Sequence, residues 1–229
     1  GNREFGGYED ENERGQMPLP ASEPTIAEMM RQDGYATGMV GKWGLGGPGS
    51  GSEPQQRGFD YFFGYLDQKQ SHNYYPTHLW ENGKRYPLDN RFFIPHPYLT
   101  GTSTNPADYK QYMGKDYASD FLTRSAISWL DTQKGALKPF FLYLAYTTPH
   151  ASLQVPDEEL AQYKGIDDKP TDGGGYTPHP FSRAARAGMI TRMDRDIGRI
   201  FATLKANGQL ENTLIIFTSD NGASAEGGA

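Results

Sequence analysis

The sequence contains no cysteine among its 229 residues, so disulfides, zinc–thiolate sites and a cysteine nucleophile are excluded within this chain. Any metal must therefore be bound by oxygen or imidazole nitrogen. Long apolar runs are also missing. The longest span residues 140–146 and 214–217, far below the roughly 20 residues that a helix needs to cross a bilayer. The formal charge of -6 comes without a basic run, so nucleic acid is not expected as a partner.

What the sequence does contain is typical of a globular α/β chain. Periodic apolar residues predict a helix over residues 116–133 and another over 189–204. Each precedes a short run that is apolar on both faces, over residues 140–146 and 213–218, as in strands buried between helices. The pattern predicts an α/β fold with a mixed, mainly parallel β-sheet sandwiched between helices.

The first part of the chain adds one further helix–strand unit to this prediction. Thr25 and Glu28 form a capping-box pattern, which predicts a helix over residues 26–33 that leads into a strand over 35–40. Residues 59–113 are predicted to be largely irregular, with one hairpin that turns at Asn82–Gly83.

Polar residues follow each of the three predicted strands. Lys42 follows the first, His150 the second, and Asp220 with Asn221 the third. Because ligands of open α/β sheets bind beyond the carboxyl ends of the strands, these side chains are expected to meet at one edge. Asp and Asn oxygens suit Ca²⁺ or Mg²⁺, whereas Lys and His donate to a tetrahedral oxyanion.

Each of these signatures also has an ordinary structural interpretation. Asp-Asn-Gly is typical of a turn, because Asn and Gly tolerate positive φ. His150 could be a solvated side chain, and Lys42 could extend past an indole to solvent. The occurrence of all three signatures at equivalent strand ends favours the functional interpretation.

A Gly-x-Gly-x-x-Gly pattern at Gly44, Gly46 and Gly49 suggests a nucleotide loop at first sight. A dinucleotide fingerprint requires a helix to begin at the glycines, so that its N-terminus meets the pyrophosphate. Residues 50–56 show no apolar period, so we expect these glycines to shape a loop beside Lys42.

Three segments resemble the sulfatases of the alkaline phosphatase superfamily. GYATGMVGKWGLG (34–46) is similar to the second sulfatase signature, and PFFLYLAYTTPH (139–150) resembles the strand that ends in a substrate histidine. ENTLIIFTSDNG (211–222) resembles the strand that ends in the metal-binding Asp-Asn. The segments keep the family order, so residues 1–229 are interpreted as a single, incomplete sulfatase catalytic domain with an alkaline phosphatase-like fold.

The resemblance implies a role for each of these residues. Lys42 would bridge the sulfate and the hydrated aldehyde of a catalytic formylglycine, and His150 would donate to the sulfate or its bridging oxygen. Asp220 and Asn221 would bind Ca²⁺, which is favoured over Mg²⁺. Many relatives carry a histidine directly after Gly-Lys-Trp, where this chain has Gly44. His72 is therefore a candidate substrate-binding imidazole, a solvated or core histidine being the ordinary alternative.

The resemblance also implies a substrate and a compartment. The substrate would be a sulfated carbohydrate, ahead of an aryl sulfate, and the compartment would be extracytoplasmic. Two alternatives stay open. One is a phosphodiesterase or phosphonate hydrolase of the same superfamily, with an upstream Thr or Ser nucleophile. The other is a non-catalytic relative that binds sulfated glycans.

Two family features are missing from this sequence. It has no Cys/Ser-x-Pro-x-Arg motif, from which formylglycine is made, and it lacks the family's first pair of metal-binding aspartates. We expect the nucleophile upstream of this chain and no turnover from residues 1–229 alone. A sheet that lacks strands has an open edge, so we also expect the isolated chain to aggregate or to bind a partner.

Overall fold

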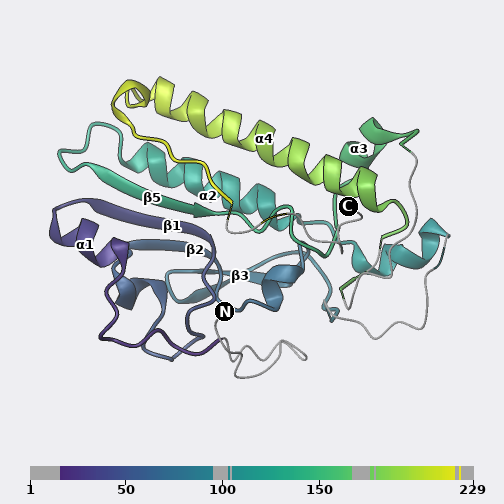
Figure 1. Cartoon of the computed structure of the whole chain (residues 1–229), viewed down its shortest axis with the longest axis horizontal. Coiled ribbons are helices and arrows are strands. Elements are labelled where there is room, and N and C mark those ends of the chain that lie inside the picture. Colours follow the sequence, from purple (N-terminus) through teal and green to yellow (C-terminus); the bar gives the residue numbers. More distant parts are fainter. Residues whose placement is uncertain are drawn as a thin grey trace.

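The computed structural model describes residues 16–94, 103, 105–166, 176–177, 179–219 and 222. Along these residues one helix is followed by four strands, and then come a helix, a strand and two further helices (Figure 1). The helices are α1 (Ile26–Gln32), α2 (Ala118–Thr132), α3 (Asp157–Leu160) and α4 (Ser182–Ala206); the strands are β1 (Ala36–Lys42), β2 (Tyr61–Tyr65), β3 (His78–Glu81), β4 (Lys84–Pro87) and β5 (Phe140–Ala145). Short 3₁₀ turns include η1 (Pro54–Arg57) and η2 (Gln70–His72).

The five strands form one sheet in the order β4-β3-β2-β1-β5. β1 runs parallel to both β2 and β5, whereas β3 is antiparallel to β2 and β4. The predicted mixed α/β fold is therefore confirmed, with its parallel part around β1. In the parallel register Lys42 lies opposite Tyr65, and Gly41 lies opposite Ala145. The carboxyl ends of β1, β2 and β5 thus share one edge of the sheet.

Helices cover both faces of this sheet. α2 and α4 lie on one face and α1 on the other (Figure 1). The alternation of side chains in β1 explains both contacts. Val40 packs in a core with Leu122 of α2 and Ile200 of α4, whereas the neighbouring Met39 packs with Ala27 of α1. Because both faces are covered, the interior residues of β1 are all buried, and the hydroxyl of the polar one among them, Thr37, donates to the Gly58 carbonyl (2.7 Å).

Two glycines set how closely the strands approach at the carboxyl edge. Gly41 has φ 123°, and a Cβ there would lie 1.9 Å from the carbonyl oxygen of Ala145. Gly64 of β2 has φ 153°, and its Cβ would lie 1.9 Å from the carbonyl oxygen of Gly41. Only glycine fits at these positions, since any side chain would overlap the neighbouring backbone.

The predicted start of α1 is confirmed in atomic detail. The Thr25 hydroxyl accepts a hydrogen bond from the Glu28 backbone N–H (3.1 Å), and the Glu28 carboxylate accepts one from the Thr25 N–H (2.8 Å). The buried Arg57 forms an ion pair with Glu28 at 3.0 Å. The hydrogen bond from Thr25, followed by Arg57, lowers the pKa of Glu28 below its ordinary value.

The structure differs from the prediction in two further places. The region predicted to be irregular contains β2, which was not predicted and in which every residue after the half-buried Tyr61 is buried. Its predicted hairpin is confirmed: β3 and β4 are joined at Asn82 (φ 48°) and Gly83 (φ 80°). α4 begins at Ser182, ahead of the first residue of its predicted apolar stripe.

The prediction of a buried strand over residues 213–218 is wrong. These residues form no strand, and the side chains of Leu214, Ile216 and Phe217 are 86%, 78% and 76% exposed. The segment runs back from the end of α4 toward the middle of the molecule (Figure 1). A strand requires a neighbour for its backbone hydrogen bonds, and none of the described strands pairs with this segment.

Candidate functional site

Lys42 is the last residue of β1 and is half-buried at the carboxyl edge of the sheet. The residue that follows is firmly held. The Trp43 backbone N–H donates to the Tyr65 carbonyl (2.9 Å), and its indole N–H donates to the Ser52 carbonyl (2.8 Å). The glycine-rich loop thus folds back on Trp43. No helix begins at its glycines, which agrees with the predicted loop role.

His150 follows β5 at the same edge and is exposed. Its backbone N–H donates to the Thr147 carbonyl (2.9 Å), and its carbonyl accepts a hydrogen bond from the Tyr74 hydroxyl (3.0 Å). The ring Nδ1 donates to the carbonyl oxygen of Ala151. Because a carbonyl oxygen can only accept, Nδ1 carries a proton in both charge states of the ring. Nε2 is therefore the atom that can take up or release a proton.

His72 ends the short turn η2 after β2 and is only 5% exposed. The carboxylate of Asp67, itself fully buried, accepts hydrogen bonds from the backbone N–H groups of Lys69 (2.7 Å) and Gln70 (3.0 Å). These bonds fix the start of η2. The imidazole of His72 lies against that of His150, with ring centroids 4.5 Å apart and planes 1° from parallel. The structure thus brings two of the predicted site residues into contact.

The predicted metal ligands Asp220 and Asn221 lie outside the described residues. Within the described part of the chain, no group of three or more His, Asp or Glu side chains could hold a metal ion.

The sequence did not point to three further residues around the histidine pair. Asp67 follows β2, so recognition of this strand would have singled it out by the same strand-end rule as Lys42. Tyr74 is fully buried, and burial raises its pKa above the ordinary value, which keeps its hydroxyl neutral and able to donate to His150. The Tyr176 ring lies nearly perpendicular to both imidazoles, and this residue has no sequence signal of its own.

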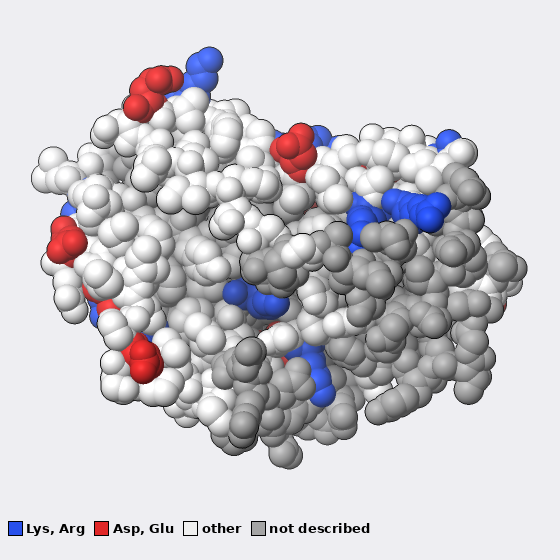
Figure 2. Space-filling model, viewed as in Figure 1, with Lys and Arg blue, Asp and Glu red and all other residues white. Residues whose placement is uncertain are grey.

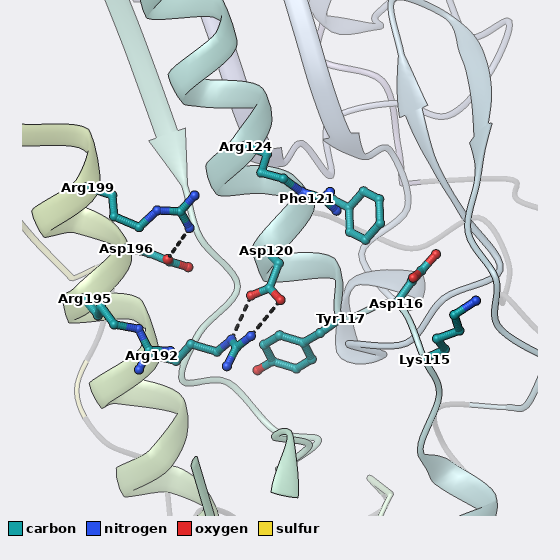
Figure 3. Close-up of a pocket in the computed structure, with 10 residues that line it drawn as sticks. All are labelled: Lys115, Asp116, Tyr117, Asp120, Phe121, Arg124, Arg192, Arg195, Asp196 and Arg199. Atoms are coloured by element: carbon teal, nitrogen blue, oxygen red, sulfur yellow. Dashed lines mark hydrogen bonds and ion pairs between the residues drawn. The ribbon is translucent and has the colours of Figure 1, made fainter. Parts of the chain in front are cut away.

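A cavity of about 370 Å³ lies between α2 and α4, and none of the predicted site residues lines it (Figure 3). At its centre Arg192 donates to both carboxylate oxygens of Asp120 (2.7 Å each) and to Glu159 of α3 (2.9 Å). The bonds to Asp120 raise the pKa of Arg192. This network joins three helices, and Arg195 and Arg199 beside it also form ion pairs with acids, so we interpret it as structural. The lining residues are Lys115, Asp116, Tyr117, Asp120, Phe121, Arg124, Arg192, Arg195, Asp196 and Arg199.

The described helices and the face of the molecule shown in Figure 2 were compared with what a membrane or a charged partner would require. None of the described helices has the length and apolar character to cross a membrane. On the face shown in Figure 2, acidic and basic side chains of the described residues are scattered and do not gather into one region.

Comparison with known proteins identifies the family. A sequence model of the family described as Sulfatase matches residues 2–229. The uncharacterized sulfatase YdeN of Escherichia coli (strain K12) is 30% identical, over 97% of this chain and 37% of the relative. An arylsulfatase of Klebsiella aerogenes is 28% identical, over 87% of this chain and 47% of the relative.

A solved structure gives the same result for the fold. The crystal structure of Ps i-CgsB in complex with k-i-k-neocarrahexaose superposes with a TM-score of 0.70 at 28% identity, over 94% of this chain and 45% of that chain. The chain thus spans less than half the length of these three proteins. Because the family model matches nearly every residue, this chain belongs to the sulfatase family.

Proposed function

We propose that the protein containing these residues hydrolyses sulfate esters, with a sulfated carbohydrate as substrate. The observation that carries the proposal is the position of Lys42 and His150 at the same edge of the parallel strands, in a chain of the sulfatase family. The likeness to Ps i-CgsB, which was crystallised with k-i-k-neocarrahexaose, supports a carbohydrate. An aryl sulfate is the alternative, since one relative is named an arylsulfatase. Family membership alone supports an extracytoplasmic location.

The two side chains supply complementary chemistry in this proposal. Sulfuryl transfer leaves negative charge on the sulfate oxygens and on the bridging oxygen. The Lys42 ammonium group stabilises the charge on the sulfate. The Nε2 of His150 donates its proton to the bridging oxygen as the ester bond breaks. Positioned donors of this kind contribute on the order of 10² to 10³ in rate each, and a general acid about 10² to 10⁴.

A calcium ion completes the proposed site. Asp220 and Asn221 would be among its ligands, because carboxylate and amide oxygens suit Ca²⁺. When bound, the ion neutralises sulfate oxygens as a Lewis acid. The nucleophile would be a formylglycine upstream of Gly1, since no Cys/Ser-x-Pro-x-Arg motif occurs in residues 1–229.

The proposal is tested on the purified full-length protein with matched sulfate and phosphate esters. We expect sulfate release, a loss of about 10²-fold or more in kcat for Lys42→Ala, and no change for Lys84→Ala in the exposed hairpin. Release of phosphate but never sulfate would indicate the phosphodiesterase alternative. Binding of sulfated glycan that survives chelation, without turnover, would indicate the non-catalytic one.

A further inference from the structure

The two imidazoles at the site differ sharply in how they are held. His150 is exposed, and its ring Nδ1 donates to the Ala151 carbonyl. His72 is buried, and its carbonyl accepts a hydrogen bond from the Ser152 backbone N–H at 3.3 Å. This bond ties η2 directly to the segment that follows His150. A fixed ring therefore lies against a solvent-facing one.

The rings of His72, His150 and Tyr176 form an aromatic cluster. The His72 and His150 planes are parallel, and the Tyr176 ring lies nearly perpendicular to both, with centroid distances of 5.2 Å and 5.4 Å and interplanar angles of 76° and 75°. Stacked and edge-to-face contacts are the two arrangements that aromatic rings prefer. Stacking sets the plane of the His150 ring, and the Nδ1 bond sets its rotation within that plane. Together they aim Nε2 in a single direction.

We propose that His72 is a positioning residue, which holds the His150 imidazole so that Nε2 can donate to the bridging oxygen of the sulfate ester. This rests on the proposed function. It replaces the sequence prediction that His72 itself binds substrate, because the His72 side chain is buried whereas the His150 ring faces solvent. Asp67 supports the arrangement by capping the turn that carries His72, and Tyr176 closes the cluster from its edge.

The test compares His72→Ala with His72→Phe in the full-length protein, on two sulfate esters. One is 4-nitrophenyl sulfate, whose leaving oxygen needs little protonation, and the other is an alkyl or sugar sulfate, whose leaving oxygen does. For the second ester we expect His72→Ala to lower kcat by about 10- to 100-fold, because misplacement of a catalytic group by about 1 Å can cost 10²-fold. The KM of His72→Ala should change by less than about 3-fold, since the substitution removes no contact that binds substrate and transition state equally.

His72→Phe keeps a flat ring for stacking, so it should restore kcat to within about 5-fold of the wild type. On 4-nitrophenyl sulfate both variants should lose less than about 3-fold, because proton donation contributes little there. His78→Phe is the matched control. It replaces another buried histidine, whose ring meets Trp80, and should leave both kcat values unchanged.

Four outcomes would overturn the inference. If His72→Phe is as impaired as His72→Ala and KM rises, His72 contacts the substrate. An equal loss on both esters, with a lowered unfolding temperature, means a purely structural role. A wild-type protein that releases sulfate from neither ester refutes the proposed function and this inference with it. An active wild type with unaffected His72 variants refutes the inference alone.

Discussion

β1 and β5 are adjacent parallel strands of similar length and apolar character, yet their environments differ. All five interior residues of β1 are buried, whereas no residue of β5 is fully buried and Tyr143 is 50% exposed. β1 is paired on both edges, while β5 pairs with β1 alone among the described strands. The apolar segment that follows α4 is more exposed still. An apolar pattern thus shows that a segment can be buried as a strand. Whether it is buried depends on the elements that pack against it.

The largest expected effect is that of a substitution within β1. Gly41→Ala should destabilise the protein by more than about 4 kcal/mol, or prevent folding, because the added Cβ would overlap the Ala145 carbonyl at 1.9 Å. Gly49→Ala is the control. It has a similarly positive φ of 74° but no atom within 4 Å, so strain alone should cost about 1–2 kcal/mol. Urea unfolding of the full-length protein measures both. Equal effects would contradict the tight approach of β1 to β5.

A matched pair of leucines sharpens the comparison. Leu122 of α2 is fully buried, whereas Leu214 is 86% exposed. Leu122→Ala should lower the free energy of unfolding by about 2–5 kcal/mol, through lost burial and the cavity left behind. Leu214→Ala should change it by less than about 0.5 kcal/mol. A cost above about 2 kcal/mol at Leu214, measured by urea unfolding of the full-length protein, would mean that this segment is buried there.

The exposed edge of β5 and the exposed apolar segment after α4 should also affect how residues 1–229 behave in isolation. An unpaired strand edge and contiguous exposed apolar side chains favour self-association. We expect residues 1–229 to form oligomers or aggregates in light scattering at micromolar concentration. Ile216→Lys combined with Phe217→Lys should reduce the scattering, whereas lysine at the already exposed Gln162 should not. A monodisperse, cooperatively melting wild-type preparation would count against this expectation.

The smallest expected effect concerns Glu28, at the start of α1, and its contribution to the free energy of unfolding at low pH. The folded-state pKa of Glu28 is lowered below its ordinary value of 4.5, first by the hydrogen bond from Thr25 and then by Arg57. Its contribution is therefore fully present above pH 4.5 and is lost as the pH falls through the lower folded value. Glu28→Gln should cost about 0.5–1 kcal/mol at pH 7. The difference from wild type should shrink in unfolding curves below pH 4.5, and a constant difference would refute the assignment.

Much of the fold could be predicted because its signals are local. The Thr25–Glu28 capping box, the apolar stripes of α2 and α4 and the Asn82–Gly83 turn depend on residues within a few positions of one another. β2 was missed because its burial comes from strands and helices far away in the sequence. The strand over residues 213–218 was predicted wrongly for the complementary reason, since its apolar pattern has no described partner.

The sequence by itself determined the family, the α/β class and the position of Lys42 and His150 at strand ends, because these follow from short motifs and periodicity. Only the tertiary structure decided that His72 lies against His150, that Asp67 caps the turn beneath it and that Tyr176 closes the cluster. Their contacts join the ends of β2 and β5, which lie on either side of β1. Such contacts depend on strand order and register, and no local pattern of residues encodes them.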